Sequence, residues 1–201
     1  MLTAFQNFLY TCAISFDLPV LDWIQANLQS DFMDKFMPFI TVFGDAGIFW
    51  MVWAALLLIF PKTRKTGLGM AFAMILGLIV CNMTLKPLVA RIRPYDLQAE
   101  LGVTIQLLCG EQHDFSFPSG HTIASFEAAV VLLYYSKKMG IPAMILAVLI
   151  AFSRMYLYVH YPTDVIFSIF AGILFAFIGN WLAKKVPLEK IKFLKKGKYE
   201  R

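Results

Sequence analysis

Long apolar runs constrain this chain more than any other feature of its sequence. Overall, 59% of the residues are hydrophobic, 15% are charged, and the mean hydropathy is +0.67. A soluble domain does not need runs of this length, whereas membrane-spanning helices do. We therefore expect an all-α, polytopic transmembrane helical bundle with five spans, whose polar-flanked ends extend the helices. These spans are expected at about residues 46–60, 68–85, 121–135, 141–158 and 163–183.

The first 45 residues are less uniform. An apolar run at residues 5–16 has about half of the roughly 20 residues that a span needs. Residues 31–45 place apolar side chains at helical spacing beside acidic ones, which indicates an amphipathic helix. We expect interfacial and amphipathic helices over residues 1–45, with a tilted sixth span as the alternative. The transmembrane core then covers residues 46–183, and a basic tail covers residues 184–201.

Basic residues indicate the orientation of the spans. They gather in the connection at residues 61–65, in the turn at 136–138 and in the tail from Lys184 to Lys198. Five alternating spans put these segments on one side, which the positive-inside rule makes cytoplasmic. The long polar connection at residues 86–119 then lies on the outer side of the cell membrane. Trp50 and Trp53 are candidate interfacial anchors for the first span.

Metal and cofactor chemistry is not indicated. The three cysteines are too few and too scattered for a disulfide framework or a zinc site. The outer-side segments show no cluster of carboxylates that suits magnesium. We expect no cofactor and no metal, and neither nucleic acid nor an obligate protein partner.

The first group of polar residues on the outer side follows the second span. Lys86 and Arg93 lie seven positions apart, so a helical continuation puts both cations on one face. Snorkelling or contact with lipid head groups is the structural alternative for such residues. Arg91 falls on another helical face, where we expect a contact with a lipid head group.

Two further groups lie on the same side. Ser119, Gly120 and His121 directly precede or begin an apolar helix, whose free N–H groups form an anion site. The alternative is a helix cap with an incidental histidine. The segment from Arg154 to Asp164 also contains His160, four residues before the aspartate, and Pro162 suits the first turn of a helix. Alone, such a His–Asp pair is usually structural, but three polar groups on one face of a membrane protein require a reason.

Together these groups suit phosphoryl transfer, in which catalysis is mainly positioning and electrostatic stabilisation. One histidine attacks phosphorus while a second protonates the departing oxygen. We expect His160 to be the nucleophile, oriented by Asp164, and His121 to be the acid and later the base. The phosphate-binding groups are expected to be Lys86, Arg93, Arg154, the Ser119 hydroxyl and the Gly120 N–H. Glu127 in the third span either pairs with a site cation, lines the substrate entrance, or is satisfied by neighbouring polar groups.

The same residues resemble the three-part signature of the type 2 phosphatidic acid phosphatase family, whose superfamily also contains the vanadium haloperoxidases. Lys86 with Arg93-Pro94, then Pro118 to His121, then Arg154 with His160 and Asp164 occur in the family's order. The resemblance implies a helical bundle, a phosphohistidine on His160, and the same roles for the other residues.

The expected function is a membrane lipid phosphatase or diphosphatase that acts on a phosphomonoester or diphosphate at the outer leaflet. By analogy we favour undecaprenyl diphosphate, with phosphatidylglycerol phosphate and phosphatidate as further candidates. One alternative is a vanadate-dependent haloperoxidase, although apolar spans make no sense for halide oxidation in water. The other is a non-catalytic lipid-binding or transport protein, for which a substituted His121, His160 or Asp164 is the expected sign.

Overall fold

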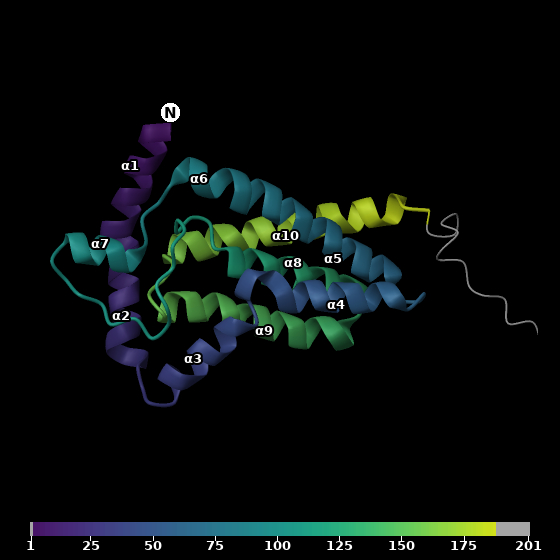
Figure 1. Cartoon of the computed structure of the whole chain (residues 1–201), viewed down its shortest axis with the longest axis horizontal. Coiled ribbons are helices and arrows are strands. Elements are labelled where there is room, and N and C mark those ends of the chain that lie inside the picture. Colours follow the sequence, from purple (N-terminus) through teal and green to yellow (C-terminus); the bar gives the residue numbers. More distant parts are fainter. Residues whose placement is uncertain (1, 188–201) are drawn as a thin grey trace, which may run out of the picture.

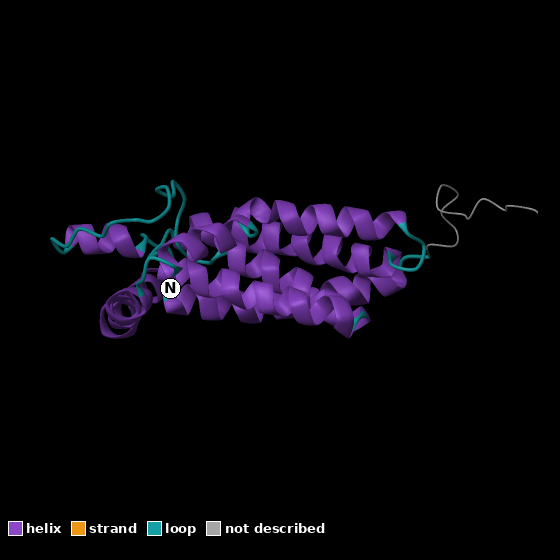
Figure 2. Cartoon of the chain, turned by 90° about the horizontal axis from the view of Figure 1, so that it is seen from below, coloured by secondary structure: helices purple, strands orange, loops and turns teal. Residues whose placement is uncertain are grey.

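The computed structural model describes residues 2–187, and all regular structure in this range is helical (Figures 1 and 2). Residues 188–201, which include most of the expected basic tail, lie outside the described part. The elements follow in this order: α1 (Leu2–Cys12), η1 (Ala13–Asp17), α2 (Leu18–Leu28), α3 (Met33–Val42), η2 (Asp45–Gly47), α4 (Ile48–Ile59), α5 (Arg64–Gly77), η3 (Leu78–Leu85), α6 (Lys86–Val89), α7 (Pro94–Glu100), α8 (Gly120–Tyr135), α9 (Lys137–Tyr156) and α10 (Pro162–Lys185).

Five of these helices, α4, α5, α8, α9 and α10, form the bundle. Helix α8 packs against α5, α9 and α10, and α5 also packs against α4 and α10. Each of the five apolar stretches in the sequence falls on one of these helices, and η3 continues α5 to Leu85. The signature residues therefore stand at helix ends, where polar groups meet without interrupting an apolar helix.

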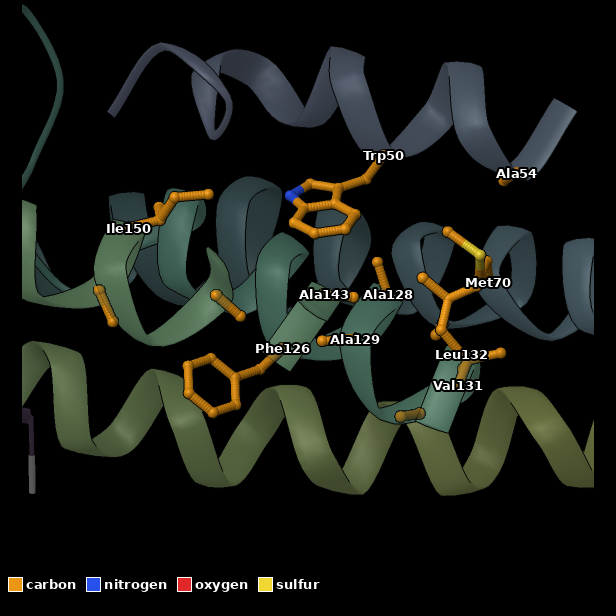
Figure 3. Packing of buried hydrophobic residues seen from close by; sticks show 14 of the residues in the cluster. Trp50, Ala54, Met70, Phe126, Ala128, Ala129, Val131, Leu132, Ala143 and Ile150 are labelled. Carbon is orange, nitrogen blue, oxygen red and sulfur yellow. The ribbon is translucent and has the colours of Figure 1, made fainter. Parts of the chain in front are cut away.

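The core of the bundle lies between α4, α5, α8 and α9, as Figure 3 shows. Trp50 is fully buried there, and its indole N–H donates to the Ser125 hydroxyl at 3.1 Å. The expectation that Trp50 anchors the interface is therefore wrong. Because α4 turns this face toward α8, the indole fills the core and finds its hydrogen-bond partner inside it.

The outside of the bundle is apolar, as a bilayer requires. Leu56, Ile75, Ile145, Phe170 and Phe177 are all at least half exposed. Within residues 2–187, four helical stretches are long and apolar enough to cross a membrane: Met33–Ile59, Arg64–Glu100, Lys137–Tyr156 and Pro162–Lys185. Helix α8, with 16 residues, is not among them. The all-helical membrane fold is thus confirmed, whereas the number of spans stays a prediction.

The N-terminal helix, formed by α1, η1 and α2, lies across one end of the bundle rather than along it (Figures 1 and 2). It exposes large apolar side chains, among them Phe8, Phe16 and Trp23. Helix α7 and the connection at residues 101–119 gather at the same end. This arrangement agrees with helices that lie at an interface.

Close packing of α5 and α10 depends on glycine. A Cβ atom at Gly179 meets the backbone oxygen of Gly69 at 2.5 Å and the backbone nitrogen of Ala73 at 2.8 Å. We expect Gly179→Val to force the two helices apart and to lower the free energy of unfolding by about 1–3 kcal/mol. The midpoint of thermal unfolding in detergent measures this change. Gly110→Val is the control, because nothing lies within 4 Å of its added Cβ; equal midpoints for both variants contradict the prediction.

Candidate active site

A cavity of about 580 Å³ opens between α4, α5 with η3, and α8. One end is polar and is lined by the predicted residues Lys86, Arg93, His121, Arg154 and His160, together with Gly120. The rest is lined mainly by apolar side chains such as Met51, Ile75 and Ile123. The three groups of residues that the sequence separates by up to 78 positions therefore meet around one space.

Lys86 and Arg93 converge on one carboxylate, that of Asp114. The predicted helical continuation between them is wrong, because α6 ends at Val89 and Ala90 takes a left-handed conformation with φ +49°. The chain instead turns and extends, and the Arg93 Nε donates to the Asp114 backbone oxygen at 2.8 Å. Both cations still face the cavity, held by the loop rather than by a helix.

Arg154 is deeply buried at the polar end, with 2% of its surface exposed. Its Nη1 donates to the Thr41 hydroxyl at 2.6 Å, but among residues 2–187 Nε and Nη2 find no hydrogen-bond partner. Buried guanidinium donors without acceptors are costly, and a planar guanidinium binds phosphate oxygens in pairs. This residue is suited to an anion that enters the cavity.

His160 stands in the turn between α9 and α10. Its Nδ1 faces Asp164 Oδ2 at 3.6 Å, and its Nε2 lies 3.5 Å from Arg93 Nη1. Burial, with added repulsion from Arg93 and Arg154, lowers the pKa of His160 well below its usual range. The imidazole is therefore neutral, as a nucleophile must be.

Several groups besides His160 contact the Asp164 carboxylate. Its carboxylate accepts from Arg91 Nη1 at 2.5 Å, from the Ser116 hydroxyl at 2.5 Å and from the Tyr161 N–H at 3.1 Å. Arg91 also bonds the buried carboxylate of Asp17 at 2.7 Å. The expected contact of Arg91 with a lipid head group is wrong, because the guanidinium turns inward, 7% exposed, to join two carboxylates.

The remaining predicted residues lie at the start of α8. His121 lines the cavity, and its Nε2 lies 2.8 Å from Asp45 Oδ1. Gly120 lines the cavity as well, whereas Ser119 is fully buried beside it. The Ser119 N–H donates to Ser168 at 2.9 Å, and its hydroxyl accepts from Thr122 at 3.0 Å. The structure thus places Ser119 behind the cavity wall.

Glu127 lies deeper in the same cavity, on α8. It is 1% exposed, and its Oε1 has no hydrogen-bond partner in the described part of the chain. Among the described residues it forms no ion pair with Lys86, Arg93 or Arg154, so the expected pairing with a site cation is not seen. Within residues 2–187, no three His, Cys, Asp or Glu side chains come together as a metal ion requires.

Known proteins share this fold. The PAP2 superfamily matches residues 66–187. The undecaprenyl-diphosphatase of Sulfolobus acidocaldarius is 32% identical over 92% of this chain and 86% of its own length. The phosphatidylglycerolphosphate phosphatase structure from Bacillus subtilis, of PAP2 type, has a TM-score of 0.70 and 25% identity, covering 92% of this chain and 95% of that one. LpxE from Aquifex aeolicus gives a TM-score of 0.71 at 26% identity, covering 82% and 94%.

The fold and the polar cavity are thus those of a membrane phosphatase of the PAP2 type. This chain belongs to the PAP2 superfamily, as its resemblance to the type 2 phosphatidic acid phosphatases predicts.

Three carboxylates that contact the site are absent from the predicted set, namely Asp45, Asp114 and Asp17. The sequence gives only a weak indication that Asp45 belongs to the site, namely its place in a Gly-Asp-Ala-Gly turn between two helices. Asp114 lies in the long polar connection, and Asp17 follows an apolar run. No spacing in the sequence links any of them to the cations or histidines that they contact.

Proposed function

We propose that this protein is an integral-membrane lipid phosphate phosphatase that works through a phosphohistidine. The observation that carries the proposal is the convergence of two buried arginines, the partly buried Lys86 and two histidines on a cavity that continues into an apolar groove. The cations suit the phosphate, and the groove between α4, α5 and α8 suits the hydrocarbon tail of a lipid.

In the proposed reaction, Lys86, Arg93, Arg154 and the Gly120 N–H hold the phosphate oxygens. His160 Nε2 attacks phosphorus, the bond from phosphorus to the lipid oxygen breaks, and its electron pair leaves with that oxygen. His121 gives a proton to the departing oxygen. Water, activated by His121, then attacks the phosphohistidine, and phosphate and the free imidazole are released. These side chains supply all the charge stabilisation, so we propose that no metal takes part.

Asp164 orients the nucleophile in this proposal. With His160 Nδ1 facing the carboxylate at 3.6 Å, Nε2 is the nitrogen directed to the cavity. Arg91 and Ser116 hold the carboxylate from the other side. Preorganisation of this kind keeps the imidazole in one tautomer and one orientation.

Among possible substrates we favour a polyprenyl diphosphate such as undecaprenyl diphosphate. The support is the likeness to the undecaprenyl-diphosphatase of Sulfolobus acidocaldarius over 92% of this chain. Phosphatidylglycerol phosphate is a second candidate, because a similar structure is a phosphatidylglycerolphosphate phosphatase. Phosphatidate offers the same chemistry, a phosphate on a lipid anchor.

We propose that α8 is a fifth span and that the site faces the outer side of the cell membrane. Sixteen residues give a helix of roughly 24 Å, and α5, α9 and α10 surround it. The basic ends lie together opposite the site, since Lys65 donates to the Ala183 backbone oxygen at 2.9 Å and Lys184 bonds Tyr134. The N-terminal helix then rests at the outer interface, and residues 184–201 form a cytoplasmic tail.

Activity is tested with detergent-purified protein and EDTA on undecaprenyl diphosphate, phosphatidylglycerol phosphate and phosphatidate. We expect phosphate release, and a loss on the order of a thousandfold or more in His160→Ala, because the nucleophile is gone. His113→Ala is the matched control, since His113 is exposed in the loop. Full activity of His160→Ala, or inactivity in EDTA that a divalent metal restores, contradicts the mechanism.

Asp114 competes with phosphate for Lys86 and Arg93. Partial burial opposes its ionisation, but these two cations outweigh it and lower the pKa of Asp114 to about 2, so it is charged at any ordinary pH. We expect Asp114→Asn to tighten inhibition by vanadate roughly tenfold, because an internal anion is removed. Inhibition constants measure this, and Glu111→Gln, in the same exposed loop, should leave them unchanged. Weaker inhibition in Asp114→Asn shows instead that the carboxylate holds the cations in place.

The orientation is tested with reporters fused to the C-terminus. A fluorescent protein that folds only in the cytoplasm should fluoresce, and alkaline phosphatase, which needs the oxidising outer side, should be inactive. The opposite pattern places the site on the cytoplasmic side.

A further inference from the structure

The second histidine of the site has its own aspartate. Asp45 Oδ1 lies 2.8 Å from His121 Nε2, and the two residues stand 76 positions apart in the chain. Asp45 belongs to the α3–α4 connection, outside the three groups of signature residues. The site therefore contains two His–Asp pairs, one at His160 and one at His121.

The α3–α4 connection has an unusual backbone where it meets His121. Ala46 has φ +48° and Gly47 has φ +67°, so two consecutive residues are left-handed. A Cβ atom at Gly44 lies only 2.6 Å from His121 Cδ2, which means that the backbone packs directly on the imidazole. Left-handed alanine is unfavourable and persists where the surrounding structure requires it. This turn brings the Asp45 carboxylate to the edge of the ring.

Other charged groups also face His121 across the cavity. Arg154 comes from α9, Lys86 from α6, and Arg93 from the segment before α7, with His160 between them and Asp114 on the loop. The cations oppose a second proton on the imidazole. Asp45 is the carboxylate in direct contact with the ring. Its negative charge therefore offsets the positive charge of these cations at the ring nitrogen that holds the proton.

We propose that Asp45 is a positioning residue for proton transfer by His121, an inference that rests on the proposed function. The carboxylate accepts a hydrogen bond from Nε2–H and supports the doubly protonated ring, which leaves Nδ1–H for the leaving oxygen. As the bond from phosphorus to oxygen breaks, the oxygen takes this proton and leaves as a neutral alcohol from a phosphomonoester, or as a protonated lipid phosphate from a diphosphate. His121 is then neutral and, in the next step, takes a proton from the attacking water.

This role predicts a dependence on the leaving group. An alkoxide leaves poorly without a proton, whereas p-nitrophenolate leaves without one. Loss of Asp45 should therefore slow the cleavage of an alkyl phosphate and spare that of an activated aryl phosphate. The ratio kcat/KM reports only the steps through formation of the phosphohistidine, so it isolates this transfer from the later hydrolysis.

The experiment measures kcat/KM against pH for Asp45→Asn with dioctanoyl phosphatidate and with p-nitrophenyl phosphate. We expect a loss of about tenfold to a hundredfold for the phosphatidate and a change within about threefold for the aryl ester. The alkaline limb of the phosphatidate profile should move to lower pH, because the imidazole loses its proton more readily without the carboxylate. Asp45→Glu should recover part of the loss, and Asp31→Asn, on an exposed residue, should behave like the parent protein.

Equal losses with both substrates, or an unmoved alkaline limb, overturn the inference and leave Asp45 a structural residue. His121→Gln separates this failure from that of the proposed function. If His121→Gln shows the leaving-group dependence and Asp45→Asn does not, the role of Asp45 alone is wrong. If His121→Gln shows none, His121 is not the acid. Addition of Asp45→Asn to His121→Gln should cost nothing more, because both act through the same proton.

Discussion

The site depends on the burial of guanidinium groups inside an apolar helical bundle. A buried cation is tolerated only where acceptors surround it, and each one here has a different arrangement. Arg93 is bonded by Asp114 and by the backbone oxygen of Val159 at 2.6 Å. Arg154 donates to the Thr41 hydroxyl, and two of its nitrogens have no acceptor among the residues that the structure describes. The cavity is therefore short of negative charge, which is the condition under which a phosphate binds strongly.

The charge around the His160–Asp164 pair is balanced by residues outside the predicted set of site residues. Arg91 lies between Asp164 and Asp17, and its guanidinium stacks 3.8 Å from the centre of the Tyr161 ring. Asp17 also accepts from the Thr163 N–H at 2.9 Å, at the start of α10. Because Asp17 belongs to the N-terminal helix, buried charges connect this helix to the His160–Asp164 pair. Its removal would leave Arg91 with one carboxylate fewer in a setting where water cannot replace it.

Much of the architecture follows from patterns that are local in the sequence. Apolar runs predict the bundle helices to within a few residues, and Pro162 marks the start of α10. The His160–Asp164 contact is likewise predictable, because four residues of a turn join the two side chains. The expectation for Trp50 fails because a hydropathy pattern does not tell which face of a buried helix meets its neighbour. For the same reason, the sequence wrongly predicted that Arg91 contacts a lipid head group.

The sequence by itself determined a membrane-embedded helical bundle and the residue types of a phosphate site, because hydropathy and short spacings act within one helix or one turn. Tertiary structure alone decided which carboxylates the cations and His121 meet. Asp45 reaches His121 across 76 positions, and Asp114 reaches Lys86 across 28. Such pairings depend on the rotation of each helix about its axis and on the path of each loop, and the packing of the whole bundle sets both. Because water does not reach a charge buried in the membrane, each buried charge needs a partner within the protein.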